Sequence, residues 1–180
     1  GAAGRSQLPS PIPAQRRLPG YDFIFKLDPP FVQTLDHAVL HNAASDDLSQ
    51  YGDLHLFTKE FSIAVSTSRP TDDAFREVLR ASLKPKVGPQ RFDLPAVAAR
   101  YVRLRIVSGH NTQFDRVQLG EFELFDKQGV NVVASHVADR GRDGAELLGY
   151  PPALGRDGSW TAENLHDGST AGAGGSWCSA

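Results

Sequence analysis

The sequence predicts an all-β protein whose strands form an antiparallel β-sandwich. Residues 100–107 carry this prediction, because the apolar side chains Val102, Leu104 and Ile106 alternate with polar ones and would line one buried face of a strand. Many short segments of this kind follow one another, with turns rich in proline, glycine and aspartate between them. No long amphipathic helix competes with them, which favours a sandwich over a mixed fold.

The strand-like segments can be placed in chain order. Residues 21–27 carry apolar side chains at every second position, and residues 61–66 do the same. Residues 75–83 are compatible with either a short helix or a strand. The expected strands are 21–27, 31–41, 54–57, 61–66, 90–94, 100–107 and 119–125.

Two regions are expected to lack regular structure. Residues 1–20 contain several prolines and no acidic residue, which is typical of a linker or an irregular arm. Residues 136–158 are rich in glycine and proline, which indicates an extended irregular segment on the surface. Residues 21–180 are then expected to form a single β-sandwich domain.

Composition limits the kinds of partner. The 180 residues are 40% hydrophobic and 22% charged, with a formal net charge of −2, which is ordinary for one globular domain. This charge supplies no field that would attract nucleic acid. No run of 18 apolar residues is present, so nothing in the sequence is expected to span a membrane. Cys178 is the one cysteine, so no disulfide can form within the chain.

Three motifs together resemble the discoidin domain, also called the coagulation factor V/VIII C-domain, which has a galactose-binding-like jelly-roll fold. Family 32 carbohydrate-binding modules share that fold. The motifs are Glu163–Thr170 (Glu-Asn-Leu-His-Asp-Gly-Ser-Thr) followed by Trp177-Cys178-Ser179, Phe61–Ser66 followed by Phe75, and the strand pair Ala99–Ile106 and Leu119–Phe125.

The order of these motifs along the chain is shifted relative to that family. Residues 131–180 match the family's N-terminal part, and Asn131–Ala134 resembles its opening strand. Two explanations stay open. The chain is either a circular permutant, which is feasible because the ends of a sandwich lie near each other, or a slice of a tandem array whose limits fall within a repeat.

The resemblance implies one structural Ca²⁺ ion. In the family its ligands are main-chain carbonyls of an early loop, the aspartate of an Asp-Gly pair, a Ser or Thr oxygen, and the glutamate that opens the last strand. Carried over to this sequence, the side-chain ligands are Asp167, Ser169 or Thr170, and Glu121. Calcium accepts several hard oxygen ligands from flexible loops, so this donor set suits it. The alternative is that Asp167-Gly168 is a plain turn and Glu121 a solvated strand residue.

The resemblance also implies a ligand site on loops at one end of the sandwich, where an aromatic ring stacks on a sugar and polar side chains bind its hydroxyls. The alternative is that Phe114 folds into the core and Tyr51 covers a hydrophobic edge. The candidate ligand-binding residues are His41, Asn42, Tyr51, Arg69, His110, Asn111 and Phe114.

Other conspicuous residues favour a structural role. Trp160 and Trp177 are expected in the core, because the family's tryptophan at the Trp177 position packs beneath the early loop. Three arginines on or beside one strand are expected to form cross-strand ion pairs on a solvated sheet face, and not a basic binding stripe. These arginines and their expected partners are Arg100, Arg103, Arg105, Asp93, Glu121 and Glu123.

The function that the resemblance implies is a non-catalytic carbohydrate-binding module that binds a glycan or glycoconjugate. Such a protein is expected outside the cell or at the cell surface, and the lack of a disulfide favours a bacterial or intracellular module over an animal secreted protein. Two alternatives remain: a protein- or phospholipid-binding discoidin domain, and a module that packs against neighbouring domains or copies of itself. A membrane partner is disfavoured because the loops are polar apart from Tyr51, Leu54 and Phe114.

No enzyme is predicted. The six histidines form none of the usual metal-binding spacings, and no nucleophile or phosphate-binding motif is present. Asp36 and His37 are adjacent in the sequence. Neighbouring strand residues point to opposite faces, so these two are not expected to act together.

Overall fold

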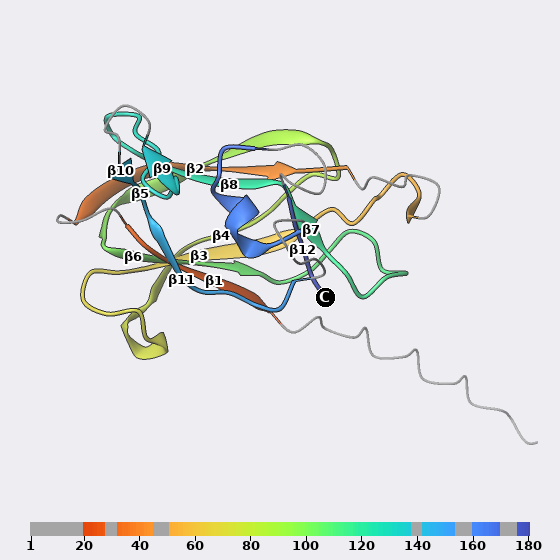
Figure 1. Ribbon diagram of the computed structural model, residues 1–180, viewed down its shortest axis with the longest axis horizontal. Coiled ribbons are helices and arrows are strands. Elements are labelled where there is room, and N and C mark those ends of the chain that lie inside the picture. Colours follow the sequence, from red (N-terminus) through yellow and green to blue (C-terminus); the bar gives the residue numbers. More distant parts are fainter. Residues whose placement is uncertain (1–19, 28–31, 45–50, 138–141, 154–159, 170–175) are drawn as a thin grey trace, which may run out of the picture.

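The computed structural model of the chain is an all-β sandwich in which two antiparallel sheets pack face to face (Figure 1). It describes residues 20–27, 32–44, 51–137, 142–153, 160–169 and 176–180. The hydrophobic core lies between the two sheets, so the predicted fold class is confirmed. The expected arm at 1–20 lies outside the described residues, apart from Gly20.

The two sheets differ in size, and two separate two-stranded ladders accompany them. The larger sheet consists, in order, of β11 (Glu146–Gly149), β1 (Tyr21–Lys26), β6 (Tyr101–Ile106), β3 (Glu60–Ser66) and β4 (Arg76–Ser82). The smaller sheet consists of β5 (Gly88–Ala99), β2 (Gln33–Asn42) and β8 (Glu121–Asp126). Two further ladders pair β9 (His136–Val137) with β10 (Arg142–Asp143) and β7 (Gln118–Leu119) with β12 (Trp177–Cys178).

The described helical elements are two short 3-10 helices, η1 (Asp72–Ala74) and η3 (Ala162–Leu165). No helix in the described residues has the length and apolar character needed to cross a bilayer.

β6 occupies the middle of the larger sheet, paired with β1 on one side and β3 on the other. Its alternating sequence is the reason, because Val102, Leu104 and Ile106 are all fully buried in the core while the side chains between them face outward. The same period places Phe23 and Phe25 of β1 in the core. The predicted alternation is confirmed for both strands.

The C-terminal strand β12 brings Trp177 into this core. Trp177 is fully buried and meets the Phe23 ring edge-to-face at 4.8 Å and the Tyr21 ring at 5.3 Å between centroids. The predicted core position of Trp177 is confirmed. Trp160, in contrast, is only half-buried and has a φ of 59°, which is unusual for a non-glycine residue.

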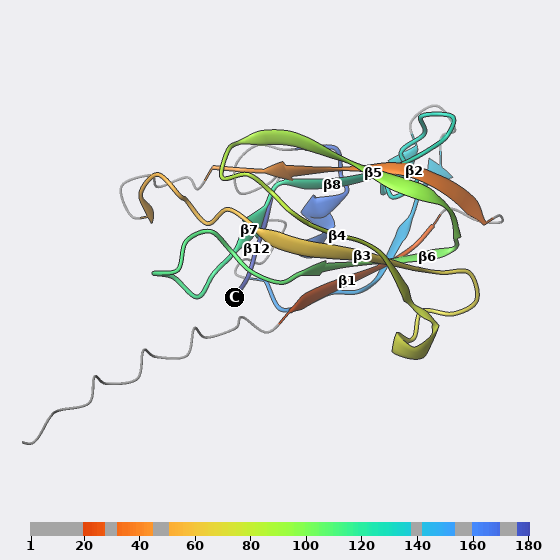
Figure 2. The ribbon, with the colours of Figure 1, turned by 180° about the vertical axis from the view of Figure 1, so that it is seen from behind.

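β5 is longer than predicted because it pairs with the whole of β2. It pairs with β2 along its length, and the chain then turns at Arg100 and continues as β6 in the larger sheet (Figure 2). The Arg100 N–H donates to the Ser66 carbonyl, and its own carbonyl accepts from Leu27 N–H. Pro89 and Pro95 are tolerated within β5 because it is the edge strand of its sheet and needs no hydrogen bonds on its outer side.

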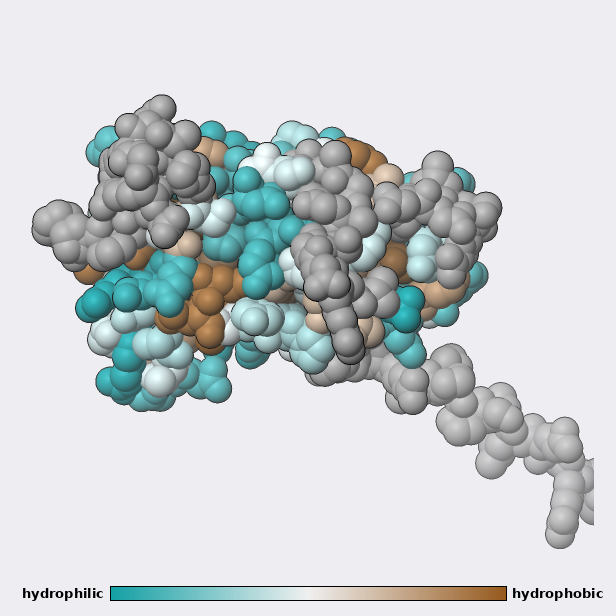
Figure 3. Space-filling model, viewed as in Figure 1, coloured by the Kyte–Doolittle hydropathy of each residue, from teal (hydrophilic) through white to brown (hydrophobic). Residues whose placement is uncertain are grey.

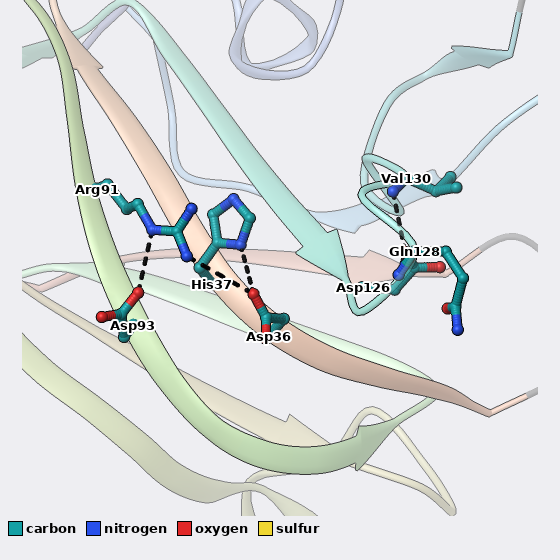
Figure 4. Close-up of polar contacts among 7 residues, drawn as sticks. All are labelled: Asp36, His37, Arg91, Asp93, Asp126, Gln128 and Val130. Atoms are coloured by element: carbon teal, nitrogen blue, oxygen red, sulfur yellow. Dashed lines mark hydrogen bonds and ion pairs between the residues drawn. The ribbon is translucent and has the colours of Figure 1, made fainter.

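The predicted strand at Asn131–Ala134 is wrong, because side chains redirect the backbone there. Asp126 ends β8, and its Oδ1 accepts hydrogen bonds from the N–H groups of Gln128 and Val130 at 2.9 Å (Figure 4). Asn131 Oδ1 then accepts from the N–H groups of Leu124 and Val133. Such local side-chain acceptors compete with strand pairing, so the segment forms a turn with one isolated bridge at Asn131.

The structure corrects the expectation for two further segments and decides between helix and strand for a third. Residues 54–56 lie in a turn, in which His55 N–H donates to the Gly52 carbonyl, and only Phe57 of the expected strand forms a bridge, an isolated one to Gln118. Residues 75–83 contain a strand, β4, and not a helix. The segment 136–158 is not wholly irregular, since it contains β9, β10 and β11. β11 forms there because the edge of β1 offers it a partner, with Phe25 paired to Leu147.

We expect Phe25→Ala to lower the free energy of unfolding by about 3–5 kcal/mol, because it empties a fully buried site between the Phe122 and His166 rings. Denaturant unfolding of the purified protein measures this. Val87→Ala is the matched control, because Val87 is 59% exposed and its truncation should change stability by less than about 0.5 kcal/mol. Equal stability of the two variants would contradict the assigned core.

Candidate functional site

The carboxylate of Glu121 is buried at the start of β8. Gly120 precedes it, and a Cβ atom at that position would lie 3.0 Å from the His41 carbonyl oxygen, so glycine allows this close approach. Glu121 itself is 2% exposed. Its Oε1 accepts a hydrogen bond from Gly168 N–H at 3.1 Å, whereas Oε2 is buried without a hydrogen-bond partner among the described residues. The alternative in which Glu121 is a solvated strand residue is contradicted.

The surroundings of Glu121 disfavour its ionised form. Burial raises the pKa of Glu121 to about 8, and the negative charges of Asp167 and Glu123 add to the rise, while the hydrogen bond from Gly168 opposes it. An ionised carboxylate in such a place needs a positive partner. At neutral pH this group therefore binds either a proton or a cation.

The loop 166–169 closes over Glu121. Gly168 has a φ of 86°, which favours glycine, and it points its N–H at Glu121. Asp167 Oδ1 accepts the Ser169 N–H at 2.8 Å, so Asp167-Gly168 is a turn that also contacts Glu121. His166 is buried and its Nδ1–H donates to the Val133 carbonyl at 2.8 Å. Burial lowers the pKa of His166, so this ring is neutral and does not balance the charge of Glu121.

The side chains of Glu121, Asp167 and Ser169 offer only oxygen donors, which are the ligands that a hard cation prefers. The described residues contain no group of three or more His, Cys, Asp or Glu side chains able to hold a metal. A cation here would combine the unpartnered Oε2 of Glu121 with the Asp167 carboxylate, the Ser169 hydroxyl and main-chain carbonyls, all oxygen donors of the kind calcium prefers. Thr170, the other predicted ligand, lies outside the described residues.

A second group of predicted residues forms a rigid pair of loops at one end of the sandwich. The Asn111 side-chain amide donates to the carbonyls of Tyr51 and His55, at 2.9 and 2.8 Å, and its Oδ1 accepts Gln113 N–H at 3.1 Å. Asn111 is 7% exposed. It therefore joins loop 51–55 to loop 110–114 and has a structural role in holding them together.

The two joined loops present a pair of aromatic rings. The Tyr51 and Phe114 rings meet edge-to-face at 4.9 Å between centroids, and both are half-buried. Phe114 does not fold into the core. His110 supports its loop from the side, because its Nε2–H donates to the Leu83 carbonyl at 2.8 Å.

Three predicted ligand residues do not join this pair of loops. Asn42 is buried and its side chain bonds Thr58 N–H and the Thr58 and Lys84 carbonyls, so it is structural. His41 lies on the smaller sheet, where its Nε2 is 2.8 Å from Glu123 Oε2. Arg69 follows the end of β3 remote from the loops, and Figure 2 shows its turn at the opposite end of the sandwich. A loop position in the sequence does not reveal which end of the fold the loop occupies.

The arginine ion pairs are real, but their predicted partners are wrong. Arg105 binds Asp22 through two bonds of 2.6 Å, and Arg103 binds Asp72 at 2.8 Å. Arg100 lies over the Tyr101 ring. Strand register decides these pairs, because Arg105 stands directly opposite Asp22 across β1 and β6.

Asp36 and His37 do not point to opposite faces of the sheet, contrary to the prediction. The pairing of β2 shifts register between Leu35 and His37, which is a β-bulge. The bulge brings His37 Nδ1 to 2.8 Å from Asp36 Oδ2, beside Arg91, whose NH2 nitrogen is 3.7 Å from that oxygen (Figure 4). The His37 ring stacks on Phe125. No local sequence signal marks a bulge of this kind.

Comparison with known proteins adds little to this geometry. No protein-family model matches the chain, and no curated protein matches it. Among solved structures, the chain is similar to the C-terminal domain of a chitobiase from Bacteroides fragilis, with 13% sequence identity and a TM-score of 0.41. The match covers 62% of this chain and 66% of that domain, just under two thirds of its length. A likeness this distant assigns neither a family nor a function.

We expect the stability of the metal-free protein to fall as the pH rises from about 4.5 to about 8. Glu121 has a folded-state pKa of about 8 against an ordinary value of 4.5, so over this range the folded state holds a proton that the unfolded state has lost. Each unit by which the folded-state pKa exceeds the unfolded-state pKa changes the free energy of unfolding by at most about 1.4 kcal/mol. Unfolding in EDTA across this range measures the slope.

The matched pair of variants is Glu121→Gln and Glu146→Gln, because both remove one carboxylate but Glu146 is exposed. The slope should become shallower in Glu121→Gln alone. Parallel stability curves for the two variants would show that Glu121 does not titrate abnormally.

Proposed function

We propose that the protein is a non-catalytic carbohydrate-binding module that holds a saccharide on the joined loops 51–55 and 110–114. The observation that carries this proposal is the Asn111 clamp, which fixes the Tyr51 and Phe114 rings in one rigid unit. A preorganised aromatic surface costs little entropy on binding, which suits ligands as weakly attractive as sugars.

The chemistry of the loop tips supports a sugar more than a charged ligand. A pyranose has an apolar face that packs on an aromatic ring, and hydroxyls that exchange hydrogen bonds with polar neighbours. Gln113 is exposed beside Phe114, and its side chain makes no hydrogen bond with a described residue. It can therefore bond a hydroxyl of a sugar stacked on the rings.

We also propose a structural Ca²⁺ ion held by Glu121, Asp167 and Ser169 with main-chain carbonyls. The ion would supply the positive charge that Glu121 lacks and would stabilise the loop 166–169, without taking part in chemistry on the ligand. The buried, unpartnered Oε2 of Glu121 supports this assignment.

Membership of the discoidin-like family is part of the same proposal. It is supported by the contact of Gly168 with Glu121 and by the pairing of β12 with β7, which bring C-terminal motifs against the segment 118–121. A circular permutation and a cut within a tandem repeat both fit these contacts. Size and oligomeric state of the full-length protein would separate them.

We expect Tyr51→Ala and Phe114→Ala each to weaken glycan binding about tenfold, because each removes one ring of the stacking surface. A glycan array identifies the oligosaccharide, and calorimetry then measures its dissociation constant. Phe75→Ala is the control, since Phe75 lies against Arg103 beyond the opposite end of β3. If no glycan binds, or if the loop variants bind as tightly as the control, the loop site is not a sugar site.

We expect CaCl₂ to raise the thermal midpoint of the EDTA-treated protein by several degrees. A free Ca²⁺ concentration one hundred times the dissociation constant raises the free energy of unfolding by about 2.7 kcal/mol. Glu121→Gln should lose this response and Glu146→Gln should keep it. An equal midpoint in CaCl₂ and EDTA for the unaltered protein would reject the ion.

A further inference from the structure

A groove of about 440 Å³ lies on the face of the sandwich where η3 stands beside the chain that leaves β11. One wall is Tyr150–Ala153 and the other is Thr161–Glu163. Figure 1 shows η3 in the centre of this face, and Figure 3 shows hydrophobic side chains beside β11 with hydrophilic ones over η3. The volume is within the range of small-molecule sites.

Both walls of the groove are anchored to the sandwich. Gly149, at the end of β11, pairs with Ile24 of β1, and Ala153 forms a bridge with Ser179. Prolines 151 and 152 lie between these anchors and restrict the backbone. On the other wall, the Trp160 carbonyl accepts Cys178 N–H at 3.3 Å and so holds the turn into η3. The groove is thus built before any ligand arrives.

The first wall presents an aromatic ring to solvent. Tyr150 is 58% exposed and lines the groove, although aromatic rings of this size are usually buried. Pro151 and Pro152 beside it extend the apolar surface. A flat ring at the edge of an open groove is suited to stacking on a flat ligand, as in other protein sites for sugars and bases.

The second wall presents polar groups that form no hydrogen bond or ion pair among the described residues. Thr161 precedes η3, but its hydroxyl makes no capping hydrogen bond. Glu163 is exposed, and its carboxylate makes no hydrogen bond or ion pair with any described residue. Glu163 is also the one charged residue among those described as lining the groove. Among the described lining residues, the Glu163 carboxylate therefore disfavours an anion and favours a cationic group.

We propose that this groove is a second binding site and that it takes an amino sugar, a pyranose unit with a protonated amine. The ring stacks on Tyr150, the amine binds the Glu163 carboxylate, and a hydroxyl bonds Thr161. An acidic sugar or a nucleotide is disfavoured by the charge of Glu163, and a purely apolar ligand would gain no polar contact from Thr161 or Glu163. The inference shares only its class of ligand with the proposed function, because it uses none of the residues of the loop site.

The probe is a glucosamine tetramer, compared with its N-acetylated form and with a uronic acid tetramer. Calorimetry gives affinity and stoichiometry, and backbone NMR shifts locate the contacts. We expect shifts at residues 148–153 and 161–163, with about tenfold weaker binding at this site in Tyr150→Ala and recovery in Tyr150→Phe. Glu163→Gln should weaken binding of the glucosamine tetramer several-fold and leave the affinity for the N-acetylated tetramer unchanged.

The outcomes separate this site from the loop site. Loss of the groove shifts in Tyr150→Ala but not in Phe114→Ala supports the groove, whether or not the loop site exists. Shifts confined to 51–55 and 110–114 support the loop site and overturn the groove. Binding of the uronic acid tetramer at the groove as tightly as the glucosamine tetramer, or an absence of shifts at residues 148–153 and 161–163, would also overturn the groove proposal. Tyr150 is exposed, so its variants should fold normally.

Discussion

Both candidate sites on the C-terminal segment depend on the burial of Trp177. Its ring fills the core between Tyr21 and Phe23, and β12 pairs with β7 beside it. That anchor sets the positions of the neighbouring segments: Cys178 N–H holds Trp160 at the start of η3, and the Asn164 side chain donates to the Ser176 carbonyl. The position of η3 in turn places the loop 166–169, which contacts Glu121, and residues 161–163, which form one wall of the groove. The packing of Trp177 in the core thus holds in place the neighbouring polar residues, which have few strong contacts of their own.

Glu121 is a buried carboxyl group with one oxygen atom, Oε2, that has no hydrogen-bond partner among the described residues. The apolar environment that makes the core stable also makes a buried charge costly, and neither His166 nor Gly168 supplies a full positive charge. The carboxyl group can be neutralised by a proton or balanced by a cation, and the two compete for the same oxygen atoms. The loop 166–169 is therefore a place where solution conditions act directly on structure, in contrast to the arginine pairs on the outer face, which are already balanced.

Sequence alone predicts the parts of this protein that depend on local pattern. The alternation in β1 and β6 reports burial directly, and Glu121 and Asp167 could be named as neighbours only through a family resemblance. The misassigned elements depend on distant partners or on single side-chain bonds. β11 exists because β1 has a free edge, the turn at Asn131 because two side-chain oxygens capture backbone N–H groups, and the contact of Asp36 with His37 because of a bulge. None of these has a periodic signal.

The polar residues that look most like ligand contacts in the sequence are mostly engaged in structure. Asn42 and Asn111 are buried, and their side chains form hydrogen bonds with backbone groups of loops. Those backbone groups have no partner in a sheet, and buried backbone groups need a hydrogen-bond partner of some kind. His110 and Arg69 also have partners within the protein. The groups left for recognition are those with no such duty: the rings of Tyr51, Phe114 and Tyr150, and the carboxylate of Glu163. Binding at the two proposed sites would therefore rest on aromatic surface first and on few polar contacts, which implies modest affinity at each. Two such sites would bind more tightly together only to a ligand that repeats, such as a polysaccharide.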